Sequence, residues 1–412
     1  MPSNYKRLGD YIHKVENRNR DLNVSNLVGL SMTKEFRVST SNIVGTDMSV
    51  YKVVNKWQFS CDFMSVIRVH KFPVVLKTDN DPVLVSPAYT VFEVNDENEL
   101  NPEYLMMWFR RSEFDRYADF KCDSAIRGGF DWDALCDCML PIPSIEKQQE
   151  IVKEYNTIQN RIALNNQLIS KLEETAQAIY KQWFVEFEFP DENGKPYKSN
   201  GGKMVWCEEL EKEIPEGWEM KRLNDFIDVT NGYAFTPLDF VKEKEIPVIK
   251  ISNINDFKVS LVETQYSKPS KQLEKYKVKY GDILITLTGS HKTQINSAVG
   301  KVAMYNYRYS SFLNQRVSKI NSEFQSVIYQ LVKSEYFRDY LMNGATGSAN
   351  QANISPDLIK DYKILFPANT LLMRLDNVFS ILRSNILKTS EENQKLEELK
   401  DLLLAKMTRV EI

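Results

Sequence analysis

Residues 6–12 read KRLGDYI, and residues 221–227 read KRLNDFI. Five of the seven residues are identical, although the two stretches lie 215 positions apart. A second match keeps the same order, because KLEE occurs at 171–174 and again at 395–398. Solenoid and propeller repeats have periods of roughly 20–50 residues, far shorter than this one. The pattern therefore indicates a tandem duplication of one type of domain, with a slightly longer second copy.

Composition is that of a globular protein with two or three domains. The chain has 412 residues, of which 42% are hydrophobic and 26% charged. It has no apolar run long enough to span a membrane and no secretory signal pattern. The five cysteines are odd in number and unevenly spread, which indicates free thiols in a reducing cytoplasm. Cys136 and Cys138 with only three histidines in the chain make a poor zinc site, so no metal is expected.

Charge is unevenly distributed along the chain, whose formal net charge is −3. Residues 220–366 contain 20 Lys and Arg against 14 Asp and Glu, a net +6. Residues 1–143 contain 17 against 20, a net −3, and residues 185–219 contain 4 against 10, a net −6. The second copy is therefore basic enough to favour a polyanion. The first copy needs locally clustered cations for the same task.

The segment 144–184 has the clearest helical periodicity. Residues spaced alternately four and three apart form a heptad seam: Ile151, Tyr155, Ile158, Ile162, Asn165, Ile169, Leu172, Ala176, Ile179 and Trp183. Adding 224 gives a second, more polar seam: Leu375, Phe379, Leu382, Ile386, Thr389, Asn393, Leu396, Lys400, Leu403 and Met407. Two such helices most simply bury their seams against each other, with Asn165 and Asn393 fixing the register. The alternative is that each helix packs on its own globular domain.

The remaining segments read as mixed α+β structure. Strands are expected in four β-branched and aromatic runs: 73–78, 89–94, 246–252 and 281–289. Amphipathic helices are expected at 101–118 and 324–343. The stretch 190–213 is rich in Gly, Pro, Asn and charge and is typical of an exposed linker. The expected parts are a first globular domain, a long helix, the linker, a second globular domain and a second long helix, with these bounds: 1–143, 144–189, 190–213, 214–366 and 367–412.

Motifs of catalysis are missing from the sequence. A base methyltransferase needs an Asn/Asp-Pro-Pro-aromatic motif, and DNDPVL at 79–84 has one proline and no aromatic residue after it. GSHKT at 289–293 lacks the upstream glycine of a phosphate-binding loop. A nuclease built on Asp191, Glu219 and Lys221 has no strand between the acids to align them on a metal. The sequence therefore predicts a binding protein without catalytic residues.

These features together resemble the specificity (S) subunit of type I restriction–modification enzymes. The passage LPIPSIEKQQEIVKEYNTIQNRIALNNQLISKLEETAQAIYKQWFVEFEFP, which starts at Leu140, is similar to that family's central conserved region. The restart IPEGWEMKRL and the stretch GDILITLTGS in the second copy are also similar. The first copy has no clear counterpart of GDILI.

The resemblance implies a division of labour. Two target recognition domains each read one half of a split site in double-stranded DNA. The two long helices form an antiparallel coiled coil with pseudo-two-fold symmetry and dock two methylation subunits, which carry S-adenosylmethionine and modify adenine. Restriction (motor–nuclease) subunits join for cleavage. The chain itself is then non-catalytic, holds no cofactor, and acts in the cytoplasm in defence against foreign DNA.

Base and phosphate contacts require amide, hydroxyl or cationic side chains on exposed loops. In the second copy the candidates are Lys250, Ser252, Asn253, His291, Lys292, Thr293, Gln294, Thr346, Ser348, Asn350 and Gln351. In the first copy they are Ser31, Lys34, Arg37, Ser124, Arg127 and Gly128. Each of them could equally be a solvated loop residue. A coiled-coil adaptor that binds no nucleic acid is the alternative function, and the +6 domain counts against it.

Overall fold

The computed structural model describes residues 5–40, 45–123, 129–255, 257–290, 297–348 and 351–409. The chain divides into two compact units. Unit 1 comprises Met1–Ala163 with Lys395–Ile412, and unit 2 comprises Leu164–Gln394. Each unit therefore contains one globular domain and part of each long helix.

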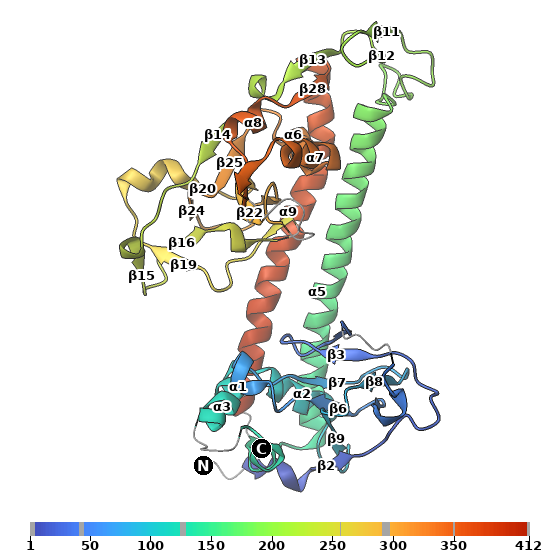
Figure 1. Cartoon of the computed structure of the whole chain (residues 1–412), viewed down its shortest axis with the longest axis vertical. Helices are drawn as coiled ribbons and strands as arrows, with labels where there is room; N and C mark the ends of the chain where they lie inside the picture. The colour runs from blue at the N-terminus through green and yellow to red at the C-terminus, as the bar shows by residue number, and fades with distance from the viewer. Residues whose placement is uncertain are drawn as a thin grey trace. The chain divides into compact units, whose positions relative to one another are not determined.

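The repeated heptapeptide closes each globular domain (Figure 1). In domain 1 the strand β1 (Tyr5–Arg7) pairs antiparallel with β10 (Met139–Pro141). In domain 2 the strand β13 (Glu219–Arg222) pairs antiparallel with β28 (Lys363–Phe366). Each first strand continues into a 3-10 turn that begins with a fully buried leucine, Leu8 or Leu223. We call β1–β10 and β13–β28 the closing strand pairs, because they join the two ends of a domain just before its long helix.

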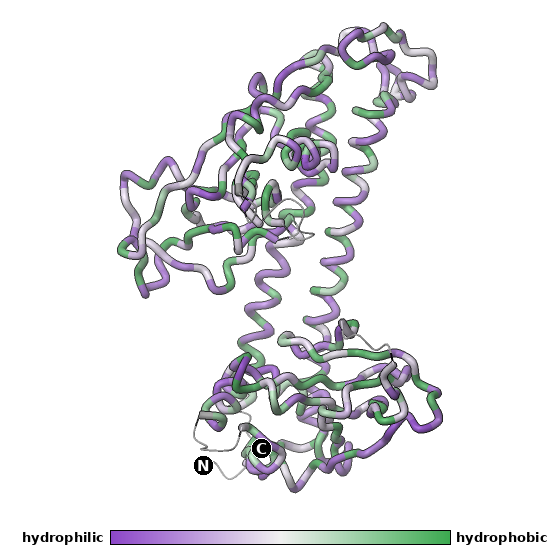
Figure 2. The backbone as a smooth tube through the Cα atoms, viewed as in Figure 1, coloured by the Kyte–Doolittle hydropathy of each residue, from purple (hydrophilic) through white to green (hydrophobic). Residues whose placement is uncertain are grey.

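The two long helices begin and end close to the predicted positions. Helix α5 spans Ile145–Tyr180 and continues as a π-helical turn, Lys181–Val185. Helix α9 spans Asn369–Lys406 and ends in a 3-10 turn, Met407–Arg409. Hydrophobic and hydrophilic residues alternate along both helices (Figure 2), as an amphipathic heptad pattern requires.

The helices pair antiparallel within each unit. In unit 2, Asn165 Nδ2 donates to Asn393 Oδ1 over 2.9 Å. The rings of Trp183 and Phe379 meet edge to face with centroids 5.6 Å apart. In unit 1 the start of α5 and the end of α9 share a hydrophobic core that contains Ile151, Tyr155, Leu403, Leu404 and Met407. The predicted antiparallel helix pair in a tandem α+β protein is thereby confirmed.

Both packing arrangements considered for the helices occur together. The seam residues Ile169 and Ala176 lie in the same core as Phe379 of α9 and also Val327 and Phe337 of domain 2. Helix α5 follows domain 1 in sequence, yet its second half completes the core of domain 2. The seam is half-buried rather than fully buried at these positions: Leu172, Ile179, Trp183, Leu382, Asn393, Leu396 and Leu403.

Domain 1 contains an antiparallel four-stranded sheet in the order β2-β9-β6-β7. Its strands are Ile12–Val15, Thr90–Val94, Phe59–Cys61 and Val74–Leu76. Two further pairs, β3–β4 and β5–β8, are formed by Val28–Leu30 with Phe36–Val38 and by Lys52–Val54 with Val83–Val85. The helices α1 to α4 are Val66–Val69, Pro102–Arg110, Ser112–Asp123 and Trp132–Cys136.

In addition to its closing strand pair, the described part of domain 2 contains three larger sheets. The six-stranded sheet β14-β25-β21-β23-β18-β17 comprises Asp228–Asn231, Val317–Asn321, Ile283–Thr286, Val302–Met304, Phe257–Val259 and Ile254–Asn255. The five-stranded sheet β15-β19-β16-β24-β20 comprises Phe240–Val241, Gln265–Ser267, Ile246–Ile249, Ser311–Leu313 and Lys277–Val278. The three-stranded sheet β22-β27-β26 comprises Thr288–Ser290, Gln351–Asn353 and Thr346–Ser348. The helices α6 to α8 are Gln325–Lys333, Glu335–Gly344 and Pro356–Lys360.

Two sequence predictions need correction in detail. The amphipathic segments 101–118 and 324–343 each form two helices, because Arg111 and Ser334 adopt extended backbone conformations. Ser334 then caps α7 by accepting a hydrogen bond from the backbone N–H of Phe337. The two breaks fall within one residue of each other in the repeat, at Arg111 in RRSEF and at Ser334 in VKSEYF.

The exposed linker is ordered as well as polar. It contains the hairpin β11–β12, formed by Met204–Cys207 and Lys212–Pro215. Tyr197 stacks on Phe189 with ring centroids 4.6 Å apart, which ties the linker to the end of α5. Among the described residues, no helix is both long and apolar enough to cross a membrane.

Candidate nucleic-acid interface

Two of the loops predicted to read DNA leave the same end of the three-stranded sheet of domain 2. In its central strand, Gln351 lies opposite Ser290 of β22 on one side and Ser348 of β26 on the other. The predicted loops at 291–294 and 348–351 therefore begin at neighbouring positions. Some of the predicted residues lie outside the described part of the chain, namely His291, Lys292, Thr293, Gln294, Asn350 and the side chain of Ser348. Of those described, Thr346 is exposed and Gln351 half-buried.

The same tripeptide, Thr-Gly-Ser, forms both outer strands of this sheet. Thr288–Ser290 and Thr346–Ser348 face Gln351–Asn353 in identical registers. A Cβ atom on Gly289 would come within 2.5 Å of the Val299 backbone nitrogen, and one on Gly347, whose φ is +145°, within 2.0 Å of the Gln351 carbonyl oxygen. Only glycine fits these positions. The repeat of this tripeptide in the sequence could have predicted the three-stranded sheet. The charge pattern and the loop composition did not predict it.

The residues predicted at 250–253 belong to a different part of domain 2, next to the five-stranded sheet. Lys250 is half-buried, bonds to Gln265, and lies with Nζ 4.4 Å from the centroid of the Phe240 ring; burial lowers its pKa. Ser252 is exposed. Asn253 is buried: its Oδ1 accepts from the Lys250 N–H and its Nδ2 donates to the Ser260 carbonyl, each over 2.8 Å. The prediction of a DNA contact by Asn253 is therefore corrected to a structural role.

In domain 1 the predicted residues 31, 34 and 37 lie on or beside the hairpin β3–β4. Lys34 is buried, with Nζ 2.8 Å from Asp115 Oδ1 and a further bond to the carbonyl of Phe109. Burial lowers the pKa of Lys34. We correct this prediction too, because the ammonium holds the domain together. Ser31 is half-buried and Arg37 is exposed, so both keep side chains within reach of a ligand.

The other predicted residues of domain 1 are Ser124, Arg127 and Gly128, and they lie outside the described residues. The described chain on either side of them is ordered by α3 and by Phe130, whose N–H donates to Cys122 Sγ over 3.1 Å.

Comparison with known proteins identifies the domain type. Residues 215–398 match the family model of the type I restriction modification DNA specificity domain. The HindI specificity subunit of Haemophilus influenzae is 25% identical over 390 residues, covering 81% of this chain and 82% of the relative. The MjaIX specificity subunit of Methanocaldococcus jannaschii is 23% identical, covering 74% and 68%. Residues 215–398 thus form a type I restriction modification DNA specificity domain, and over most of its length the chain is similar to type I restriction enzyme specificity subunits.

A solved structure shares the fold of this chain. The type I restriction–modification S subunit from M. genitalium is 12% identical, with a TM-score of 0.53 over 99% of this chain and 96% of that one. At this identity the likeness concerns the fold alone.

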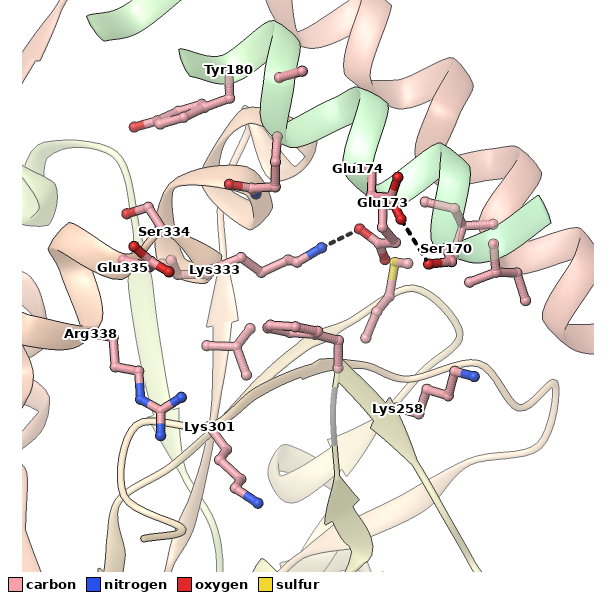
Figure 3. A pocket seen from close by; sticks show the side chains of 18 of the residues that line it. Ser170, Glu173, Glu174, Tyr180, Lys258, Lys301, Lys333, Ser334, Glu335 and Arg338 are labelled. Atoms are coloured by element: carbon pink, nitrogen blue, oxygen red, sulfur yellow. Dashed lines mark hydrogen bonds and ion pairs between the residues drawn. The ribbon is translucent and has the colours of Figure 1, made fainter. Parts of the chain in front are cut away.

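Helix α5 anchors domain 2 through a buried ion pair (Figure 3). Lys333 at the end of α6 reaches Glu173 on α5, and their side chains are only 3% and 17% exposed. The Tyr329 hydroxyl donates to the same carboxylate over 3.3 Å. Beside this pair, Gln177 Nε2 donates to Gln330 Oε1 over 2.9 Å. These bonds fix the orientation of α6 on the long helix, and through α7 they position strand β26 of the candidate interface.

Proposed function

We propose that each globular domain reads one half of a bipartite site in double-stranded DNA. Domain 2 reads through the loops that leave β22 and β26–β27, and domain 1 through the hairpin β3–β4 and the segment after α3. The observation that carries this proposal is the three-stranded sheet, since it brings two polar loops that are distant in sequence to one edge. The net +6 of domain 2 supports a polyanionic ligand.

The rest of the complex follows from the family. The relatives are subunits of type I restriction enzymes, and we infer that this chain docks two methylation subunits on its helix pair. Those subunits supply S-adenosylmethionine and methylate adenine, and restriction subunits join them for cleavage. In this proposal the present chain selects the site and performs no chemistry.

Reconstitution tests the proposal against the coiled-coil adaptor. The chain is purified alone and together with its methylation subunit, and methyl transfer from labelled S-adenosylmethionine to genomic DNA is mapped by sequencing. We expect methylation at one bipartite motif by the complex and none by the chain alone. Methylation without a sequence preference, or a stable complex that does not bind DNA, would support the adaptor instead. Methyl transfer by the pure chain would refute its non-catalytic role.

A further inference from the structure

A pocket of about 1050 Å³ lies entirely within unit 2 (Figure 3). Its walls come from the long helices α5 and α9, from α6 and α7, and from residues on and beside β18 and β23. Five basic side chains line it, and two of these are paired within the unit: Lys333 with Glu173, and Lys181 with Glu186 over 3.5 Å. The other three have no ion-pair partner among the described residues: Lys258, Lys301 and Arg338.

The acidic residues of the pocket do not balance these three cations. Glu173 is used by Lys333, and Glu174 by Lys171, 2.6 Å away. Glu335 is the one acidic lining residue without an ion-pair partner among the described residues. The wall therefore presents an excess of unpaired positive charge, and it does so in the domain that carries the net +6. Such a surface attracts an anion with several negative groups.

Two of the three cations are connected to segments that lead into the three-stranded sheet, Lys301 through a backbone hydrogen bond and Arg338 along the chain. The Lys301 N–H donates to Thr286 Oγ1 over 2.9 Å, two residues before β22 begins. Arg338 lies on α7, which ends one residue before β26. From Thr286 to Ser290 the chain advances by four residues, about 13 Å at roughly 3.3 Å per residue. A stretch of that length can span at most about four base pairs at roughly 3.4 Å each.

We propose that Lys258, Lys301 and Arg338 bind backbone phosphates of the duplex a few base pairs beyond the bases read by domain 2. The inference rests on the proposed function, because it needs DNA at the three-stranded sheet. Figure 3 shows the Lys301 and Arg338 side chains extending on the same side of the pocket, with Lys258 across from them. Phosphate contacts of this kind add affinity and fix the register of a protein on DNA without reading sequence.

The test measures the salt dependence of DNA binding by the complex of this chain with its methylation subunit. A double variant, Lys301→Ala with Arg338→Ala, is compared with the wild type on a duplex that contains the methylated motif and on one that lacks it. Each lost phosphate contact reduces the slope of log K against log salt by about 0.9. We expect the double variant to lose nearly two units of slope on both duplexes while the methylated motif stays the same. Arg338→Lys should keep the wild-type slope.

The matched control is the double variant Lys195→Ala with Lys198→Ala. It removes the same charge from exposed residues of the acidic linker and should leave the slope unchanged. Co-purification with the methylation subunit shows that each variant is folded. If the pocket variant kept the wild-type slope while the wild-type complex still preferred its motif, the inference about the three cations would be overturned and the proposed function would stand. If a variant unfolded at the same temperature as the wild type but no longer formed the complex, the cations would be assigned to a contact with the methylation subunit, which would also overturn the inference. A wild-type complex without any preferred motif would instead contradict the proposed function.

Discussion

The ends of the two domains are alike, whereas their middles differ. Both domains close with an antiparallel strand pair, a buried leucine and an exposed ion pair, Arg7 with Asp137 and Arg222 with Asp361. Between these ends, domain 1 has a four-stranded sheet and two strand pairs, and domain 2 has sheets of six, five and three strands. The shared ends meet the long helices, and the divergent middles carry the candidate interfaces. Duplication has therefore preserved the attachment of each domain to the helices and left the reading surface free to change.

The two domains also differ in how each stabilises a buried ammonium group. Lys34 pairs with Asp115, and both belong to domain 1. Lys333 of domain 2 pairs with Glu173, which lies on the helix that follows domain 1. Domain 1 thus pairs Lys34 within itself, as it also pairs its buried Lys52 and Lys77, whereas Lys333 of domain 2 depends on α5. This comparison leads to the following predictions.

The largest effect is expected when one long helix is lengthened without the other. In the antiparallel register set by the Asn165–Asn393 pair, Asn160 of α5 is level with Glu398 of α9, and Arg161 is level with Glu397. Four residues inserted after Asn160 alone shift half of the seam by about one turn. Calorimetry should then show a lower unfolding temperature and more than one unfolding transition. Matched insertions after Asn160 and after Glu397 should restore it, because a four-residue stutter keeps the apolar face. If the single insertion behaved like the matched pair, the seam would not set the register.

Neutralising Asp115, the partner of Lys34, or Glu173, the partner of Lys333, should lower the free energy of unfolding by about 3 kcal/mol or more. The reason is that an unpaired charge then remains buried. Asp115→Asn should lower hydrogen-exchange protection in domain 1. Glu173→Gln should lower it in domain 2, although Glu173 follows domain 1 in sequence. The control Glu174→Gln changes an exposed carboxylate one residue away and should leave protection unaltered. Loss of protection in domain 1 from Glu173→Gln would contradict the dependence of domain 2 on α5.

A smaller effect of opposite sign is expected at the polar pair of the seam. Replacing both Asn165 and Asn393 by Leu should raise the free energy of unfolding by about 1 kcal/mol, because one buried amide and one half-buried amide give way to apolar packing. The same variant should relax the register, since a polar seam residue specifies alignment at some cost in stability. Chemical denaturation measures the first effect, and cross-linking of cysteines placed beside the seam measures the second. Lower stability would show that the amides contribute more than their burial costs.

Much of the fold was predictable because it depends on local periodicity. The heptad spacing gave both long helices and the Asn165–Asn393 contact, and the β-branched runs gave β7, β9, β16 and β21. The break at Arg111 was not predictable, since arginine is a good helix former, whereas serine is a preferred N-cap residue and Ser334 was a usable signal for the second break.

The candidate interface was predictable only in outline. Lys34 and Asn253 look like surface residues in the sequence, and their burial depends on partners set by tertiary structure, such as Asp115, which is 81 positions from Lys34. The pairing of two Thr-Gly-Ser strands with one partner also depends on the fold. The three unpaired cations of the pocket come from β18, α7 and the residue before β23, and sequence spacing alone does not bring them together.

The most direct test exchanges the middle of domain 1 and keeps its ends. Residues 12–137 are replaced by the corresponding segment of another specificity subunit, while both closing strand pairs and both long helices are retained. The methylome of a host that carries only this chimera and the methylation subunit is then sequenced. We predict that one half of the methylated motif changes, while the other half and the spacer between them stay the same. A change in both halves, or an unchanged motif, would contradict the claim that each domain reads its own half of the site.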